Sequence, residues 1–232
     1  MKSIHYLLSF WLIVTGCSTS GLITQSDTTG DSDAEFLGYA KDLPPELIQQ
    51  YVLAYVDTVK IDVKKDKIAK EVKELYRFSN NELLWTTLGS PNSDARELLN
   101  ELSEAREHGL NPEHYVSDSL LIQFDDTYAY NQEIDVLELI ELDVELSTAF
   151  IKYSYALHYG QVEESELGEQ WIPSKKHVDL APYLAVKGFK EAIRMIAPKN
   201  RAYRSLQKKL NSYLALKDEG GWNNIPDSMR VT

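Results

Sequence analysis

Residues 133–160 read EIDVLELIELDVELSTAFIKYSYALHYG, and we expect this stretch to organise the rest of the fold. Apolar side chains recur in it at helical spacing, and a second apolar set widens the stripe. The first set is Ile134, Leu137, Ile140, Val144, Phe150, Tyr153 and Leu157, and the second is Leu139, Leu142, Leu146 and Ala149. A wide apolar face on a long helix contacts several neighbours, so the stretch predicts the central helix of an all-α domain. By itself the pattern indicates packing and not chemistry.

Other helices are predicted wherever apolar residues at helical spacing lie between proline, glycine or asparagine breakers. They cover residues 44–59, 68–78, 94–108, 112–121, 179–186, 190–196 and 201–216. Residues 125–131 are expected to form a polar loop. No run with a period of two is long enough for more than a minor strand. The predicted fold class is an irregular all-α domain built around one long central helix.

The inward faces of the first and last of these helices follow from their apolar periodicity. For residues 44–59 the predicted inward set is Leu47, Tyr51, Ala54, Tyr55 and Val59. For residues 201–216 it is Tyr203, Leu206, Leu210, Tyr213 and Leu214.

The amino terminus has the organisation of an export signal. Lys2 precedes an apolar run that is too short to span a bilayer, and the run ends in Val14-Thr15-Gly16-Cys17. Small residues followed by cysteine resemble a bacterial lipobox, which implies cleavage before Cys17 and lipidation of its thiol. Because Ser18 and not an acid follows, the resemblance implies the outer membrane, with the protein on its periplasmic side. The alternative is an ordinary signal peptide with a stray cysteine.

Three regions follow from this reading: a lipoprotein signal at 1–17, a flexible tether at 18–41 and a folded domain at 42–232. The tether is predicted from its serine, threonine, glycine and aspartate content. Cys17 is the only cysteine in the chain, so an internal disulfide is excluded. The formal net charge of -12 argues against a nucleic acid partner, since phosphate binding needs a basic surface.

Few residues are candidates for chemistry. With Cys17 assigned to the lipid, a cysteine nucleophile is not expected, and no cofactor motif is present. His108 and His114 have no common metal-ligand spacing, so no metal site is predicted. Glu141 and Glu145 share a helix face and leave a glycosidase open, although such carboxylates usually face solvent in an acid-rich chain.

The segment 161–177 is long, acidic and carries an isolated Trp171. A loop of this length in a compact domain is usually functional or mobile, and tryptophan is enriched in binding hot spots. Trp171 is therefore a candidate contact residue. The alternative is that Trp171 folds back as a lid over Tyr153 and Leu157, because large apolar side chains are more often buried.

Four groups of residues then occur in a fixed order along the chain. The groups are Leu75-Tyr76 with Leu84-Trp85; Ala105, His108-Gly109-Leu110, Pro112 and Tyr115; Glu141-Leu142-Asp143, Ala149, Tyr153 and residues 157–162; and Ala197-Pro198, Tyr203-Arg204, Leu206, Tyr213, Gly221-Trp222 and Ile225-Pro226. Together they resemble the amino-terminal scaffold domain of YcbB-type L,D-transpeptidases. Trp85 and Tyr115 are expected to pack beneath the turn at Gly109.

Proteins of that family cross-link peptidoglycan stems, and they normally continue into a peptidoglycan-binding module and a catalytic domain with an SHGCxR-like motif. No residue here matches that motif, so the resemblance implies fold, compartment and pathway but carries over no catalytic residue. The expected function is a non-catalytic periplasmic lipoprotein in peptidoglycan remodelling, with peptidoglycan or a transpeptidase as partner. The alternative is the amino-terminal fragment of a split or truncated transpeptidase.

Overall fold

The computed structural model describes residues 37–58, 67–87, 89–129, 133–161, 178 and 180–221. The chain divides into two compact units, Met1–Glu35 and Phe36–Thr232, and every described residue belongs to the second. The signal, the lipobox and Cys17 therefore lie outside the described residues, as does the segment 162–177 with Trp171.

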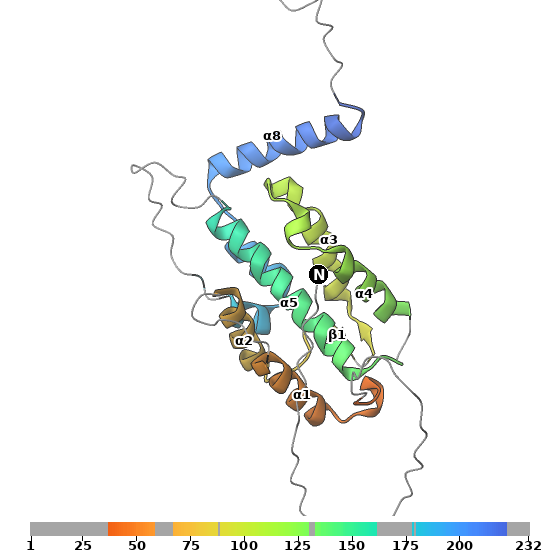
Figure 1. Ribbon diagram of the computed structural model, residues 1–232. Helices are drawn as coiled ribbons and strands as arrows, with labels where there is room; N and C mark the ends of the chain where they lie inside the picture. The colour runs from red at the N-terminus through yellow and green to blue at the C-terminus, as the bar shows by residue number, and fades with distance from the viewer. Residues whose placement is uncertain are drawn as a thin grey trace, which may run out of the picture. The chain divides into compact units, whose positions relative to one another are not determined.

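The central helix α5 spans Val136–Tyr159 and confirms the expected organiser of the fold. Asp135 caps its start by accepting a hydrogen bond from the backbone N–H of Leu137 at 2.7 Å, and Gly160 ends it at a positive φ of 80°. The predicted apolar residues are buried, except Leu137 at the edge of the stripe. Helices α1, α2, α3, α4 and α7 all contact α5, which runs through the middle of the helices in Figure 1.

The described residues form an all-α fold. The helices are α1 (Pro45–Thr58), α2 (Lys67–Phe78), α3 (Ser93–Ser103), α4 (Asp118–Ala129), α5, α6 (Ala181–Lys187), α7 (Phe189–Ile196) and α8 (Arg201–Asp218). Short 3₁₀ helices are η1 (Ala40–Asp42), η2 (Ala105–His108) and η3 (Pro112–His114). The strands β1 (Thr86–Thr87) and β2 (Ser90–Pro91) pair antiparallel, Thr86 opposite Pro91. None of the described helices is long and apolar enough to cross a membrane.

The fold begins earlier than the tether boundary expected from the sequence. The backbone N–H of Ala40 donates to the carbonyl of Ile134 at 3.0 Å, and that of Val136 donates to the carbonyl of Gly38 at 3.1 Å. Ala40 is fully buried, and Tyr39 forms a β-bridge with Asp135. Residues 37–41 thus close over the start of α5 and belong to the folded domain and not to the tether.

The helix expected at 94–108 is divided, and the loop expected at 125–131 is largely helical. Residues 105–108 tighten into η2, a common ending for an α-helix, which keeps Ala105 buried. Helix α4 continues to Ala129. Its polar composition was misleading because Phe124 and Thr127 are buried, while Asp125 and Asp126 occupy the outer face.

The inward face of α1 is also displaced from the predicted one. Ile48, Val52 and Val56 are the buried residues, spaced four apart on one face. Tyr51 and Tyr55 lie beside them and are only half-buried. The apolar arc of α1 is wide enough to accommodate either choice, so periodicity alone did not fix which part of it faces α5.

Gly109 reverses the chain between η2 and η3, and its φ of 75° lies in the left-handed region. A β-carbon there would meet Leu210 Cδ2 at 3.7 Å, an ordinary contact distance, so the cost of a substitution is backbone strain. We expect Gly109→Ala to lower the free energy of unfolding by about 1–2 kcal/mol, measured by urea denaturation. Gly109→Asn should cost less, since asparagine tolerates this conformation better. Equal costs for the two variants would contradict the strain argument.

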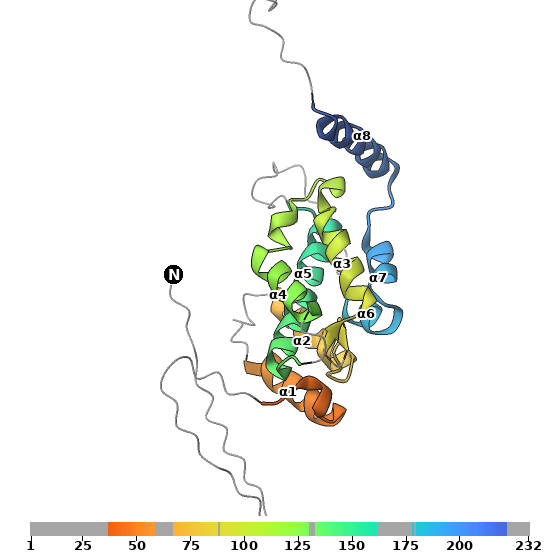
Figure 2. The same cartoon turned by 90° about the vertical axis from the view of Figure 1, so that its right-hand side faces the viewer.

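Helix α8 contradicts the prediction that its apolar face turns to the core. No residue of α8 is buried, and Leu206 and Tyr213 are 72% and 47% exposed. Tyr203, Leu210 and Leu214 are half-buried. The helix lies at the end of the fold (Figure 2) and contacts η2. Only part of its apolar arc is therefore covered.

Candidate functional site

The most organised polar cluster in the described residues surrounds Asp143, a fully buried carboxylate in the middle of α5. The Tyr76 hydroxyl donates to Oδ1 at 2.6 Å, and the backbone N–H of Leu84 donates to the same oxygen at 3.0 Å. Oδ2 accepts from the backbone N–H of Trp85 at 2.8 Å, and from the backbone N–H and hydroxyl of Thr86, both at 2.9 Å. Five donors therefore fix the segment after α2 to the central helix.

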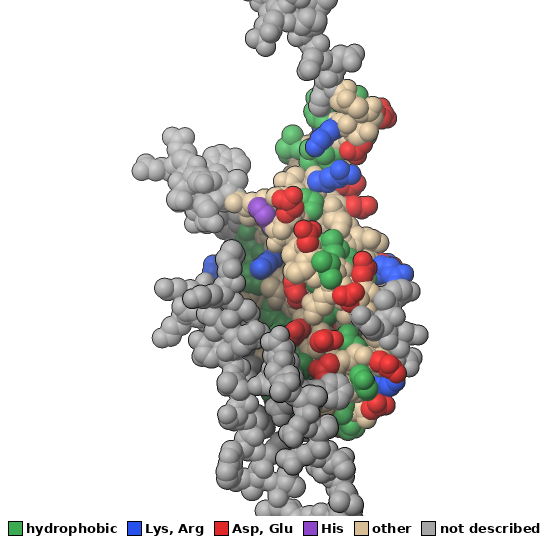
Figure 3. All heavy atoms as spheres, turned by 45° about the vertical axis from the view of Figure 1, so that its right-hand side comes forward, with side chains coloured by type: hydrophobic (Ala, Val, Ile, Leu, Met, Phe, Trp, Pro, Cys, Tyr) green, Lys and Arg blue, Asp and Glu red, His purple; other side chains and the backbone are tan. Residues whose placement is uncertain are grey.

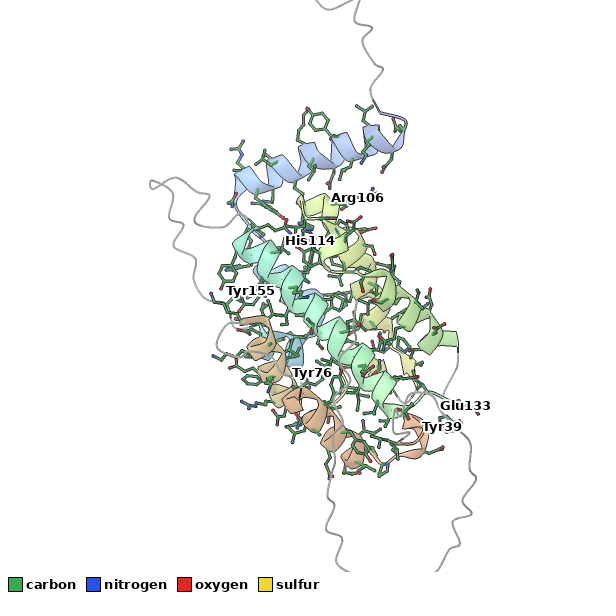
Figure 4. The ribbon with its side chains drawn as sticks, viewed as in Figure 1. Tyr39, Tyr76, Arg106, His114, Glu133 and Tyr155 are labelled. Carbon is green, nitrogen blue, oxygen red and sulfur yellow. The ribbon has the colours of Figure 1, made fainter. Side chains whose placement is uncertain are left out.

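Ser147 extends this cluster by one helical turn. Its Oγ accepts from Trp85 Nε1 at 2.8 Å and lies 3.0 Å from the Tyr76 hydroxyl. The Trp85 ring centroid lies 5.9 Å from those of Phe150 and Phe189, so Trp85 joins α5 to α7. Trp85 therefore belongs to the Asp143 cluster. The expectation that it packs beneath the Gly109 turn is wrong. Figure 4 shows Tyr76 on α2, facing α5.

The protonation states follow from burial and from the donors. Burial raises the pKa of Asp143 above its usual range, while the hydrogen bonds from Tyr76, Leu84, Trp85 and Thr86 oppose that rise. Burial, followed by the nearby Asp143 carboxylate, raises the pKa of Tyr76 well above its ordinary value. Tyr76 therefore stays protonated and donates. Both oxygens of Asp143 are occupied by donors of the protein itself, so the cluster holds backbone and does not present a reactive group.

In the sequence Asp143 was singled out only within the group Glu141-Leu142-Asp143, and its burial was not predicted. A signal was available, because Asp143 lies three residues after Ile140 and three before Leu146, on the buried face of α5. An acid at such a position is buried only when it is paired or hydrogen-bonded, so the pattern pointed to a cluster of donors.

Glu141 and Glu145, the glycosidase candidates, lie on the α1 side of α5. Glu141 is exposed, and its pKa is raised by partial burial and then by Glu138, Glu145 and Asp135. Tyr55 on α1 has its pKa raised to about 12 by burial and by both glutamates. The arrangement places two carboxylates beside a protonated tyrosine hydroxyl on the surface of α1 and α5.

The two histidines considered for metal binding have other partners. The His108 Nδ1 atom shares a hydrogen bond of 2.5 Å with the Tyr203 hydroxyl, and Gln207 Nε2 lies 3.2 Å from the same nitrogen. His114 Nδ1 lies 3.4 Å from Gln161 Nε2. Within the described ranges no three histidine, cysteine or acidic side chains come together in a group able to hold a metal ion.

A groove lies along α8 where the helix crosses η2, and we call it the α8 groove. It has a volume of about 400 Å³ and is lined by His108, Tyr203, Leu206, Gln207, Lys209, Leu210 and Tyr213. Arg106 forms an ion pair with Asp218 at the end of α8, with 3.4 Å between Arg106 Nη2 and Asp218 Oδ2. Figure 4 shows Arg106 beneath that helix. The lining is mostly apolar, and its His108 is hydrogen-bonded to Tyr203.

Aromatic side chains support the η2 end of the groove. The Tyr153 ring lies 5.5 Å from Tyr115 and 6.4 Å from His108, in edge-to-face contacts. The Tyr153 hydroxyl donates to Glu101 Oε1 at 2.8 Å, and burial followed by Glu101 raises its pKa above the ordinary value. Tyr115 therefore packs near the Gly109 turn, as expected. From the sequence, His108, Tyr115 and Tyr153 were expected to form a helix end and part of the core. The groove was not predicted.

The described residues therefore form an all-α domain with a hydrogen-bonded core and an open groove. The family model described as Scaffold domain matches residues 70–210, from α2 into α8. The chain belongs to this family, which is the amino-terminal, non-catalytic scaffold domain of L,D-transpeptidases. The comparisons with curated proteins and with solved structures each found no match.

Proposed function

We propose that the protein is a non-catalytic lipoprotein that works as a scaffold in peptidoglycan cross-linking or remodelling. The observation that carries the proposal is the Scaffold domain match over residues 70–210, which includes the central helix and the Asp143 cluster. The Asp143 cluster supports a scaffold role, because its donors and acceptors are spent on holding α2, α5 and the β1 segment together.

The expected partners are peptidoglycan or a transpeptidase. The test is to delete the gene and to compare the cross-links that L,D-transpeptidases form in isolated sacculi, by muropeptide analysis. A scaffold role predicts fewer such cross-links and restoration by the wild-type gene. Purified protein incubated with sacculi should release no muropeptides. Release that is lost in Glu141→Gln with Glu145→Gln would refute the non-catalytic role and support a glycosidase.

Anchoring through Cys17 gives a separate prediction, motivated by the lipobox-like sequence at 14–17. Cys17→Ser removes the thiol that would carry the lipid, and several acyl chains are needed for stable anchoring. We expect the variant in the soluble periplasm or unprocessed at the inner membrane, measured by cell fractionation. Ser18→Ala is the control and should remain with the outer membrane. Outer-membrane recovery of Cys17→Ser would refute the lipid anchor.

Trp171 remains the candidate contact residue of the proposed scaffold. If it contacts a partner, Trp171→Ala should weaken retention on sacculi or on the transpeptidase while the melting temperature stays nearly unchanged. If it is a lid on the core, the same variant should lose stability together with binding.

A second candidate function is a fragment of an active L,D-transpeptidase whose catalytic half is encoded separately. The observation that favours it is that the matched family is one part of a longer enzyme. Sequencing the DNA downstream of the gene distinguishes the two: an open frame with a peptidoglycan-binding module and an SHGCxR-like motif would support the fragment.

A further inference from the structure

Helix α8 differs in charge from the rest of the chain. It carries five basic residues and one acid, whereas the whole chain has a formal net charge of -12. The basic residues are Arg201, Arg204, Lys208, Lys209 and Lys217, and the acid is Asp218. A basic helix on an acidic protein is attracted to an acidic surface of another molecule.

The exposed apolar residues of α8 lie on one strip. Leu206 and Tyr213 are seven residues apart and therefore share a face, and Lys209 and Lys217 border it on either side. The Lys209 Nζ atom lies 5.3 Å from the centre of the Tyr213 ring. Half of the apolar arc is already used, because Tyr203 and Leu210 contact the His108–Gly109 turn. The remaining exposed set is Leu206, Lys209, Tyr213 and Lys217, and we call it the outer strip of α8. Its first three residues also line the α8 groove.

Helix α4 presents a surface of the opposite charge. Leu121 and Ile122 are 41% and 62% exposed, and the acids Asp118, Asp125 and Asp126 are exposed beside them. There is no basic residue in α4. Figure 3 shows acidic side chains spread over the face of the fold below α8, with hydrophobic side chains exposed among them.

These two surfaces do not meet within one molecule. Helix α8 contacts η2, whereas α4 contacts α5 and β2, and both Figure 1 and Figure 2 show α4 and α8 apart. Each surface combines two large exposed apolar side chains with flanking charges of one sign, and the signs are opposite. A contact between them would cover apolar area on both sides and would pair Lys209 and Lys217 with aspartates.

We propose that the outer strip of α8 docks on the outer face of α4 in a second copy of this chain. An anionic membrane is a less suitable partner than a second copy. As the narrow apolar strip of α8 approached the membrane, the membrane would repel the acidic surface around α4 and α5. A helix-on-helix contact is smaller than a standard interface, so the association is concentration-dependent and weakened by salt. This inference does not depend on the role in peptidoglycan.

The test uses charge reversal on the full chain, purified in a nonionic detergent and followed by sedimentation equilibrium. Lys209→Glu with Lys217→Glu reverses the outer strip, and Asp125→Lys with Asp126→Lys reverses α4. Each variant alone should raise the self-dissociation constant about tenfold or more at low salt, since it replaces attraction by repulsion. An equimolar mixture of the two variants should associate as wild type does, because each strip again meets an opposite charge.

The matched control is Arg204→Glu with Lys208→Glu, which makes the same charge change on the opposite side of α8 and should leave self-association unchanged. A chain that is monomeric at every concentration would overturn the proposal. Weakening without rescue in the mixture, or equal weakening by the control, would also overturn it. If the wild type is monomeric and binds anionic phospholipid vesicles, and the outer-strip reversal abolishes that binding, the surface is a membrane contact and the proposal fails.

Discussion

Asp143→Ala is expected to lower the free energy of unfolding by about 3–5 kcal/mol, because several buried donors lose their acceptor and each unsatisfied buried donor costs about 1–3 kcal/mol. The substitution removes the acceptor of five donors, among them the buried N–H groups of Trp85 and Thr86. The Tyr76 hydroxyl keeps a second partner in Ser147 Oγ at 3.0 Å. A buried donor without an acceptor has lost its hydrogen bonds to water and gained none in the protein, which destabilises the folded state. Urea denaturation followed by circular dichroism measures the loss.

Asp143→Asn keeps the volume of the side chain but removes its charge and one of its two acceptor oxygens, so it separates these contributions to stability. The amide has nearly the shape of the carboxylate, but one of its two oxygens becomes an NH₂ group that faces donors on either side of Asp143. We therefore expect Asn to recover little of the lost stability. Glu141→Gln is the control, because Glu141 lies on the exposed side of the same helix and should change stability by no more than about 0.5 kcal/mol. A wild-type melting curve for Asp143→Asn would show that the cluster is not what fixes the β1 segment.

The central helix could be predicted because its apolar period is long and regular. Every strongly periodic residue of α5 except Leu137 is buried, and the glycine at 160 ends the helix where expected. Breakers were equally informative: Asn80 and Asn81 adopt positive φ values of 54° and 58° just after α2. Such signals are local, so they do not depend on the rest of the fold.

What could not be predicted depends on contacts between distant parts of the chain. The period of α8 is as clear as that of α5, yet Leu206 and Tyr213 are exposed because the neighbouring elements cover only half of the helix. Periodicity says that a helix has an apolar face but not how much of it meets a partner. The same limit explains Asp143, whose burial becomes intelligible only when the donors of residues 84–86 are brought beside it.

The candidate site shows this difference most directly. His108, Tyr203 and Tyr213 were all singled out in the sequence, but as parts of separate helices. The α8 groove exists because the Gly109 reversal brings η2 under α8, and because His108 binds Tyr203. The spacing of residues along the chain does not show that η2 and α8 come into contact.

Trp85→Ala is expected to cost about 3–5 kcal/mol of stability, the range for removing a large buried aromatic side chain. Trp85 is 1% exposed, and its ring joins Phe150 of α5 to Phe189 of α7. The substitution leaves a cavity between two helices that the rest of the fold holds in place. Phe78→Ala is the matched control: this aromatic side chain is 54% exposed at the end of α2, and its removal should cost no more than about 0.5 kcal/mol.

Trp85→Phe then divides the cost between packing and hydrogen bonding. Phenylalanine keeps most of the ring contact but loses the Nε1 donor to Ser147 Oγ, so we expect an intermediate cost of about 1–2 kcal/mol. Combining Trp85→Phe with Ser147→Ala should cost less than the sum of the two single changes, because both remove the same hydrogen bond. Strict additivity in chemical denaturation would mean that the indole stabilises the fold by its volume alone. The polar part of the Asp143 cluster would then end at Tyr76 and Thr86.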